Sequence, residues 1–358
     1  MPTVLPLVEF IEQSNKQLII DVRTPAEYEQ GHIHGALNLP LFTNEERAIV
    51  GTTYKQKGRQ PAILIGFELI GARWVNYIRQ VEEWLKSIGS KKVFVHCWRG
   101  GMRSGAMAWA LKFYGFDAYL LQGGYKTFRH FYIDQCQRNY PFIILGGKTG
   151  SAKTLTLLEM QKHGEQVIDL EALANHQGSS FGSKGIHVQP SQEQFENLLA
   201  HELWQCDISK PIWLENESLT IGRVAIPLAI YHQMKQAHVI DVNFPLEERV
   251  QFLNKDYGQL DPEFLKSSVR AISKRLGPNE TKLCLQAIDE NRMCDFIRQT
   301  LVYYDKTYTQ GKKARESERV HEVILDKIDP KNNALAVLEF VQQLGDLLQP
   351  IQSATSAL

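Results

Sequence analysis

Short apolar runs alternate with longer amphipathic runs along the first 139 residues. Each short run is bounded by polar residues or glycine, which is typical of a buried strand. Thr24 followed by Pro25 is typical of a helix start, because threonine caps and proline suits the first turn. The predicted strands are 18–20, 92–96 and 118–121, and a further helix is predicted over 104–114. Repeated strand–helix units predict a parallel sheet covered by helices.

Residues 45–75 fit this alternation poorly and are predicted to be an inserted helical piece. The boundary between two domains is expected at 135–141, after which a second series of strands, loops and helices begins. Its predicted strands are 142–145, 167–168, 212–214 and 238–242, followed by a mostly helical segment 246–310, a helix near 333–348 and a disordered tail. The fold class is therefore α/β, with one parallel-sheet domain at 1–139 and a second at 140–358 that carries a helical insertion.

The composition is that of a globular protein, with 43% hydrophobic and 22% charged residues among 358. No apolar run is long enough to span a bilayer, and the first residues lack the pattern of a signal peptide, so we expect a cytoplasmic protein without a membrane partner. The five cysteines are odd in number and form no C-x-x-C pair. A disulfide framework or a cysteine metal site is therefore not predicted.

The net charge is zero, but the two predicted domains differ in sign. Residues 1–139 contain 17 Lys and Arg against 12 Asp and Glu, a net charge of +5, which leaves −5 for the remainder. A basic domain suits a polyanionic partner such as a nucleic acid. Attraction between a basic and an acidic domain explains the same asymmetry equally well.

Cys97 lies in the run VFVHCWRGGMRS, which extends from Val93 to Ser104. An apolar strand leads into the cysteine, a glycine-rich loop and then a helix. The amides of such a loop and the N-terminus of the helix form an anion site, and a thiolate is what this cradle stabilises. Cys97 is therefore a candidate nucleophile, with Arg99 and Arg103 as the groups that neutralise a bound anion. The candidate supporting residues of the loop are Trp98, Gly100, Gly101 and Ser104.

The loop alone fits two classes of enzyme. The pattern H-C-x5-R-S, from His96 to Ser104, is the signature of cysteine phosphatases, and rhodanese-type sulfur carriers use the same strand–loop–helix arrangement. The upstream runs DVRTPAEY (21–28) and GHIHGALNLP (31–40) resemble the N-terminal signature of the rhodanese family. In this fold Asp21 and Arg23 are expected to be structural residues that anchor the ends of strands and loops. His96 is expected to be a strand histidine whose ring nitrogens are hydrogen-bonded, and not a general base.

The run GGKTGSAKT, residues 146–154, follows a predicted strand and precedes a predicted helix. It matches the P-loop pattern G-x-x-x-x-G-K-T except that Ala152 replaces the last glycine, which crowds the phosphates or shifts the backbone. Lys153 is expected to contact phosphate oxygens, and Thr154 a phosphate or Mg²⁺. The candidate residues for a phosphate or diphosphate are Gly147, Thr149, Gly150, Ser151, Lys153 and Thr154.

Acidic residues follow two of the predicted strands of the second domain. Glu215 and Glu217 come after an apolar strand, as in a Walker B element, and Asp169 and Glu171 follow strand 167–168. They are candidates to hold Mg²⁺ through water or to contact substrate; ordinary strand-end acids fit as well, so no directly bound metal is assigned. Ser179 and Ser180, in a polar glycine-rich loop, are candidate substrate contacts.

Over almost its whole length the sequence resembles the tRNA 2-selenouridine synthase family. The motifs that carry the resemblance are HCWRGGMRS (96–104), LQGGYK (121–126), the P-loop, the segment 169–182, QPSQ (189–192) and ENES (215–218). The family's G-K-T is A-K-T here, which bears on the efficiency of phosphate binding.

The resemblance implies a transferase that replaces sulfur by selenium in the wobble 2-thiouridine of tRNA. It implies selenophosphate as donor and an S-geranyl intermediate made from geranyl diphosphate. We expect the P-loop to hold geranyl diphosphate, with Mg²⁺, and Cys97 to accept or activate selenium. The basic residues expected to contact tRNA are Lys55, Lys57, Arg59, Lys126 and Arg129.

Two other functions fit the same residues. A cysteine phosphatase with a nucleotide-binding domain would use the Cys97 loop on a phosphate, and a tRNA or nucleotide sensor without catalysis would use both loops only for binding.

Overall fold

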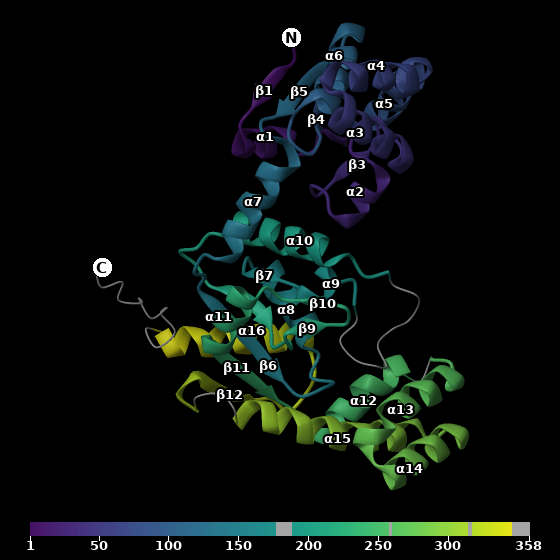
Figure 1. Cartoon of the computed structure of the whole chain (residues 1–358). Coiled ribbons are helices and arrows are strands. Elements are labelled where there is room, and N and C mark those ends of the chain that lie inside the picture. The colour runs from purple at the N-terminus through teal and green to yellow at the C-terminus, as the bar shows by residue number, and fades with distance from the viewer. Residues whose placement is uncertain (177–187, 258–259, 314–316, 346–358) are drawn as a thin grey trace. The chain divides into compact units, whose positions relative to one another are not determined.

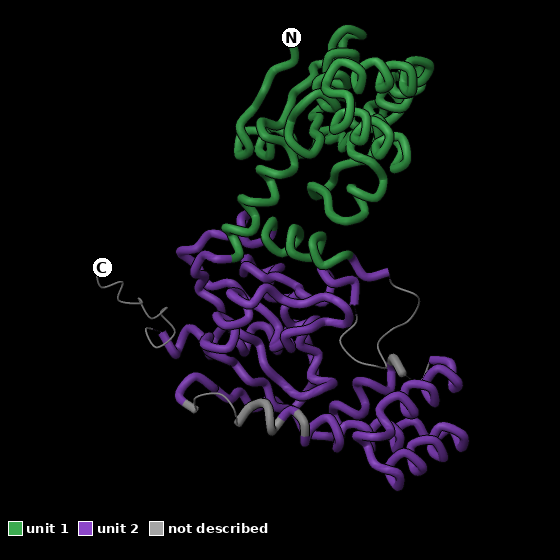
Figure 2. The backbone as a smooth tube through the Cα atoms, in the orientation of Figure 1, with its two compact units in different colours: residues 1–136, 191–201 green, residues 137–190, 202–358 purple. Residues whose placement is uncertain are grey.

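The computed structural model describes all residues except 177–187, 258–259, 314–316 and 346–358. It divides into two compact units (Figure 2). Unit 1 comprises residues 1–136 and 191–201, and unit 2 comprises 137–190 and 202–358. The division thus lies three residues before the predicted boundary, and segment 191–201 packs with unit 1. The Ser179–Ser180 loop and the predicted disordered tail lie outside the described residues.

Unit 1 is built on a parallel five-stranded sheet in the order β1-β5-β4-β2-β3 (Figure 1). Its strands are β1 (Thr3–Leu5), β2 (Leu18–Asp21), β3 (Ala36–Asn38), β4 (Lys92–His96) and β5 (Asp117–Leu121). Its helices are α1 (Leu7–Ser14), α2 (Pro25–Gln30), α3 (Asn44–Lys57), α4 (Arg59–Ile70), α5 (Trp74–Ile88), α6 (Met102–Tyr114) and α7 (Gly124–Cys136). The predicted inserted helical piece is confirmed as α3 and α4.

Strand β4 is buried on both faces, as its unbroken apolar sequence predicts for a parallel sheet. Because successive side chains of a strand point to opposite faces, Val93 and Val95 join one core cluster and Phe94 faces the other side. The first cluster includes residues of α5 and α6, and Phe94 meets Phe10 of α1 edge to face at 5.3 Å between ring centroids. Helices therefore cover both faces of the sheet.

Unit 2 contains a second parallel sheet, in the order β12-β11-β6-β8-β7, and a small antiparallel pair β9-β10. Its strands are β6 (Phe142–Gly147), β7 (Gln166–Ile168), β8 (Ile212–Glu215), β9 (Thr220–Ile221), β10 (Val224–Ala225), β11 (His238–Asn243) and β12 (Val320–Ile324). Its helices are α8 (Lys153–Lys162), α9 (Leu170–Leu173), α11 (Leu228–Gln236), α12 (Leu246–Tyr257), α13 (Pro262–Leu276), α14 (Pro278–Asp289), α15 (Met293–Lys313) and α16 (Pro330–Leu344), while α10 (Gln192–Gln205) begins in unit 1.

The α/β class with parallel sheets is thus confirmed in both units. Helices α12 to α15 pack around their own apolar cluster and form the predicted helical insertion (Figure 1). Across the described ranges, every helix is too short or too polar to cross a bilayer.

Both loops singled out in the sequence leave the carboxyl end of an inner strand. Cys97 follows β4, and the P-loop follows β6. In unit 1 the chain moves from β2 to the edge strand β3, whereas from β4 it moves the other way to β5. Ligands of open α/β sheets bind where the strand order reverses in this way. The topology therefore places Cys97 at the expected binding position of its sheet.

A buried ion pair anchors the strand end next to Cys97. The Arg23 side chain is 1% exposed, and its Nη2 donates to Asp21 Oδ2 at 2.6 Å and to the Gly31 carbonyl at 2.6 Å. Its guanidinium carbon lies 3.7 Å from the centroid of the Tyr125 ring. Burial acts to raise the pKa of Asp21, but His96 and Arg23 together lower it. Asp21 and Arg23 are thus structural anchors, as expected.

Replacing Arg23 by alanine leaves the Asp21 carboxylate buried and unpaired. We therefore expect Arg23→Ala to lower the free energy of unfolding of unit 1 by about 3–5 kcal/mol, measured by urea denaturation. The matched control is Lys86→Ala, which breaks the exposed pair with Glu83 and should leave stability unchanged. Equal effects of the two variants would contradict the anchoring role of Arg23.

Candidate functional site

The Cys97 thiol lies at the base of a loop between β4 and α6. Cys97 is 3% exposed and forms no disulfide. Its Sγ lies 3.1 Å from Ser104 Oγ, and that hydroxyl also lies within 3.3 Å of the Gly101 carbonyl. Ser104 is thus a direct hydrogen-bond partner of the sulfur as well as a supporting residue of the loop.

The start of α7 holds the backbone of this loop. The amide of Tyr125 donates to the Cys97 carbonyl at 2.8 Å, and the amide of Lys126 donates to the Trp98 carbonyl at 2.9 Å. Gly124, at φ +65°, passes so close that a Cβ there would lie 2.4 Å from the Cys97 carbonyl oxygen. Only glycine permits this approach. The QGGYK motif therefore holds the backbone of the cysteine loop in position.

His96 is fully buried beside the loop. Burial lowers its pKa to about 4, so the ring is neutral near pH 7. Its Nε2 lies 3.8 Å from Asp21 Oδ2, and neither ring nitrogen has a hydrogen-bond partner among the described residues. The expectation that His96 is not a general base agrees with this environment; the expectation that its nitrogens are satisfied is wrong.

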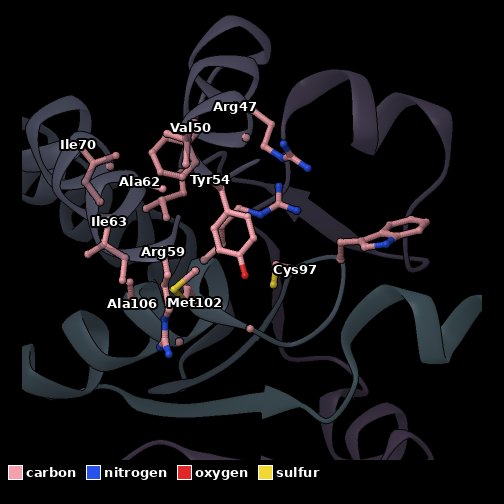
Figure 3. A pocket seen from close by; sticks show the side chains of 18 of the residues that line it. Arg47, Val50, Tyr54, Arg59, Ala62, Ile63, Ile70, Cys97, Met102 and Ala106 are labelled. Carbon is pink, nitrogen blue, oxygen red and sulfur yellow. The ribbon is translucent and has the colours of Figure 1, made fainter. Parts of the chain in front are cut away.

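Cys97 opens into a cavity of about 860 Å³ (Figure 3). Helices α3, α4 and α6 supply most of its walls, and residues after β3 and the cysteine loop supply the rest. Apolar side chains predominate, and the walls contain no Asp or Glu among the described residues. The lining residues used below are Arg47, Val50, Tyr54, Lys55, Arg59, Ile63, Phe67, Cys97, Trp98, Arg99, Met102, Arg103 and Ala106.

The two arginines of the loop differ in their availability to an anion. Arg103 lines the cavity, but its guanidinium donates to both carboxylate oxygens of Glu27, at 2.6 and 3.1 Å. Burial acts to raise the pKa of Glu27, and the hydrogen bonds from Arg103 outweigh this and lower it. Arg99 forms no side-chain hydrogen bond or ion pair within the described part of the chain. Arg99 is therefore the loop cation without an internal counter-ion.

Trp98 and Met102, the bulky residues of the loop, remain 37% and 50% exposed. Both line the cavity rather than packing wholly beneath the loop. Trp98 also approaches Tyr125, with 5.7 Å between ring centroids. Apolar surface is thus present directly beside the thiol.

In unit 2 the P-loop leaves β6 and enters α8. Gly147 has φ +149°, and a Cβ there would lie 3.0 Å from the Val242 carbonyl oxygen. Ala152 has φ +52°, a left-handed conformation that glycine adopts without cost and alanine does not. The position at which alanine replaces the P-loop glycine thus has a backbone conformation that favours glycine. Ser151 closes the loop by donating from Oγ to the Lys148 carbonyl at 2.6 Å.

Glu215 connects the P-loop to β8. It accepts a hydrogen bond from Thr154 Oγ1 at 2.7 Å, and the Lys153 ammonium lies 3.2 Å from its other oxygen. This is the arrangement expected of a Walker B acid, because β8 pairs directly with β6. The predicted residues Lys153, Thr154 and Glu215 therefore form one contiguous group.

Glu171 and Glu217 lie beside Glu215, with carboxylate oxygens of the three residues within 4.8 Å of one another. Burial and the charge of Glu215 raise the pKa of Glu171 to about 8 and that of Glu217 to about 7. Three carboxyl groups this close together fit a divalent cation such as Mg²⁺, because the bound cation would stabilise their ionised form. Asp169 instead caps α9 by accepting from the Ala172 amide at 2.9 Å.

Two residues that bond to the P-loop backbone, Tyr308 and Arg249, were missed in the sequence. Tyr308 of α15 donates to Asp241 Oδ1 at 2.6 Å and accepts from the Gly147 amide at 2.7 Å. Arg249 of α12 donates to the Thr149 carbonyl at 3.2 Å and to Asp305 at 2.7 and 2.8 Å. No local pattern marks these two residues, because the fold brings them to the loop from 161 and 100 positions away. They attach the helical insertion to the phosphate loop.

The neutral state of buried His96 predicts a pH dependence of stability. The unfolded histidine binds a proton below about pH 6.5, whereas the folded one does so only near pH 4. The stability of unit 1 should therefore fall as the pH drops from 6.5 to 4, and His96→Gln should flatten this slope. Exposed His163→Gln is the control, and chemical denaturation across this range is the measurement. An unchanged slope in His96→Gln would contradict the assignment.

The left-handed Ala152 predicts a stabilising substitution. Ala152→Gly removes a strain of about 1–2 kcal/mol and costs about 0.5–1 kcal/mol through the entropy of the unfolded chain, so the net gain should lie between zero and about 1.5 kcal/mol. Thermal unfolding should shift upward by about 2 °C. Asn291→Gly, at φ +56°, should change little, because asparagine tolerates this region. A lower melting temperature for Ala152→Gly would refute the strain argument.

Comparison with known proteins gives two family matches and several relatives. Residues 6–130 match the rhodanese-like domain, and residues 140–329 match the AAA domain of tRNA 2-selenouridine synthase. A protein of Nitrosomonas europaea named tRNA 2-selenouridine synthase is 39% identical over 67% of this chain and 63% of its own length. Proteins of the same name from Shewanella denitrificans and Shewanella frigidimarina are 36% and 34% identical, over 81% and 86% of this chain and 87% and 92% of their own lengths.

The match covers 63% and 62% of the lengths of the two Nitrosomonas relatives and most of the Shewanella ones. The rhodanese-like match contains the Cys97 loop, and the AAA match contains the P-loop with Glu215. Both candidate sites thus lie inside the regions that define the matches. This chain belongs to the tRNA 2-selenouridine synthase family.

Proposed function

We propose that this chain replaces sulfur by selenium at wobble 2-thiouridine of tRNA, with selenophosphate as donor and S-geranyl-2-thiouridine as intermediate. The observation that carries the proposal is one chain with two anion-binding loops of different chemistry. The first loop presents the Cys97 thiol and Arg99, which has no counter-ion among the described residues. In the second loop, Lys153 and Thr154 contact the carboxylate of Glu215. The names of the relatives support the substrate and the product.

The first proposed step is alkylation of the thiocarbonyl sulfur. The sulfur attacks C1 of geranyl diphosphate, the C–O bond breaks, diphosphate leaves with the electron pair, and the base loses its N3 proton. We assign the diphosphate to the P-loop, where Lys153 and the N-terminus of α8 supply positive potential. Glu171, Glu215 and Glu217 would hold Mg²⁺, which when bound neutralises charge on the departing diphosphate.

The second proposed step is exchange of the alkylated sulfur. Selenium of selenophosphate attacks C2 of the base, the C–S bond breaks, and geranylthiolate leaves and takes up a proton. Water then cleaves the P–Se bond, which gives inorganic phosphate and the selenocarbonyl. Geranylthiolate is a much better leaving group than a bare sulfide, so alkylation makes this exchange feasible. We assign the selenium donor to the Cys97 loop, with Arg99 as its counter-charge and the Cys97 thiol as the proton donor to the departing geranylthiolate.

A cysteine phosphatase remains the enzyme alternative from the loop signature. In this chain Arg103 donates to both carboxylate oxygens of Glu27, so a phosphate in the loop would compete with Glu27 for this arginine. The selenium-transfer proposal does not require Arg103, because Arg99 is available. Turnover of an aryl phosphate that depends on Cys97 would favour the phosphatase.

The test separates the two steps with one variant each. Purified protein is incubated with 2-thiouridine tRNA, geranyl diphosphate and selenophosphate, and nucleosides are analysed by mass spectrometry. Lys153→Ala should reduce S-geranyl-2-thiouridine by at least about 100-fold, since it removes a charged transition-state contact. Cys97→Ala should leave geranylation intact and abolish 2-selenouridine.

Exposed Lys162→Ala on the same helix as Lys153 is the matched control and should retain both products. Normal 2-selenouridine from Cys97→Ala would disprove the assignment of the selenium donor to this loop. Normal geranylation by Lys153→Ala would disprove the assignment of the diphosphate to the P-loop.

A further inference from the structure

The cavity beside Cys97 is more apolar than a site for a small inorganic anion requires. Tyr54, Phe67 and Met102 line it and remain 52%, 58% and 50% exposed. Val50 and Ile63 add aliphatic surface from α3 and α4 (Figure 3). A concave apolar surface of this kind marks a ligand site, because a folded chain otherwise buries such side chains. The cavity, at about 860 Å³, lies within the usual range of about 300–1,000 Å³ for small-molecule sites.

The sequence of α4 explains why this surface stays uncovered. The helix reads RQPAILIGFELI and carries apolar residues around its whole circumference. One side is buried through Ala62, Gly66 and Ile70. The neighbouring side, with Ile63 and Phe67, faces the cavity. A helix that is apolar all round is normally buried all round, so the cavity-facing side of α4 is suited to an apolar ligand.

Positive charge accompanies the apolar walls. Arg47, Lys55, Arg59 and Arg99 line the cavity, and their side chains form no hydrogen bond or ion pair with any residue that the structure describes. No acidic side chain in the described lining offsets them. The cavity therefore combines an apolar interior with cations that suit a phosphate backbone. Arg129, another residue predicted to contact tRNA, is instead paired with Glu196 and Asn197.

We infer that this cavity binds the geranyl chain of S-geranyl-2-thiouridine while the nucleoside is still part of tRNA. The chain lies against Val50, Ile63 and Met102, the modified base lies toward Cys97, and the unpaired cations contact phosphates of the RNA. The inference rests on the proposed function and adds that the second step selects its substrate by the alkyl group. The P-loop keeps the diphosphate of the first step.

This occupant explains why an apolar pocket adjoins a nucleophile site. In the exchange step the C–S bond to the geranylthio group breaks, so the alkyl chain must lie next to the point where selenium attacks C2. Burial of a ten-carbon chain against apolar walls stabilises the complex through the hydrophobic effect. An unmodified 2-thiouridine has no such chain and would leave the cavity empty. The cavity therefore favours the substrate that has a good leaving group.

The test uses two substitutions on different walls of the cavity and one control. Ile63→Glu places a carboxylate on the cavity side of α4, and Ala106→Phe fills the cavity from α6 (Figure 3). Leu64→Glu is the matched control, because Leu64 is the next residue of α4, is 64% exposed and does not line the cavity. Thermal unfolding of all three variants verifies the fold.

The substrates are two anticodon stem-loop RNAs, one with S-geranyl-2-thiouridine and one with S-methyl-2-thiouridine. The full-length protein converts each with selenophosphate, and 2-selenouridine is measured by mass spectrometry. We expect the wild-type protein to prefer the S-geranyl RNA in kcat/KM by at least about tenfold. Ile63→Glu and Ala106→Phe should reduce this preference to near unity, mainly through KM, while Leu64→Glu should keep it.

A preference that survives in both cavity variants, or that Leu64→Glu loses to the same extent, would overturn the inference. If the wild-type protein makes 2-selenouridine from neither RNA, the proposed function fails. Equilibrium binding of the RNAs then tests by itself whether the cavity is a prenyl site. Tighter binding of the S-geranyl RNA than of the unmodified RNA, lost in Ile63→Glu, would support the cavity as a prenyl site. Equal binding of the two RNAs would reject it.

Discussion

The buried guanidinium of Arg23 is the contact on which the cysteine site depends. It joins the end of β2, through Asp21, to the Gly31 carbonyl and to the face of the Tyr125 ring. Tyr125 in turn donates its amide to the Cys97 carbonyl. Because a buried charge must be paired, these partners cannot separate without a large energetic cost. The anchoring residues thus fix the loop from two sides, and segment 191–201 adds Glu193 and Asn197 as hydrogen-bond partners of the Tyr125 hydroxyl.

The two anion loops differ in how their charges are balanced. At the P-loop, Lys153 and Thr154 already contact Glu215, and the carboxyl groups of Glu171 and Glu217 lie beside it, so acidic groups outnumber the lysine. At the cysteine loop the excess is positive, because only Arg103 has an acidic partner. The first loop therefore suits a phosphate that arrives with a divalent cation. The second suits an anion or RNA phosphates without a metal.

Much of this arrangement could be predicted from the sequence because the loops are local. A strand, a glycine turn and a helix start are encoded within about ten residues, so the Cys97 loop and the P-loop were both identified with their sheets. The acid Glu215 was found because it follows the strand that pairs with β6. Glu27, Arg249 and Tyr308 were missed, since each reaches its loop through the tertiary fold. The cavity was not predicted either. The sequence of the insertion 45–75 does not indicate which faces of its helices pack against the core and which face the cavity.

The apolar insertion also changes the electrostatics at Cys97. The thiol is 3% exposed and opens onto walls formed largely by α3, α4 and α6. When an apolar ligand fills such a cavity it displaces water, and the attraction between Arg99 and an anion beside the thiol becomes stronger as the local dielectric constant falls. An alkyl chain bound at this position would therefore do more than add affinity: it would complete the low-dielectric environment in which Arg99 stabilises the anion.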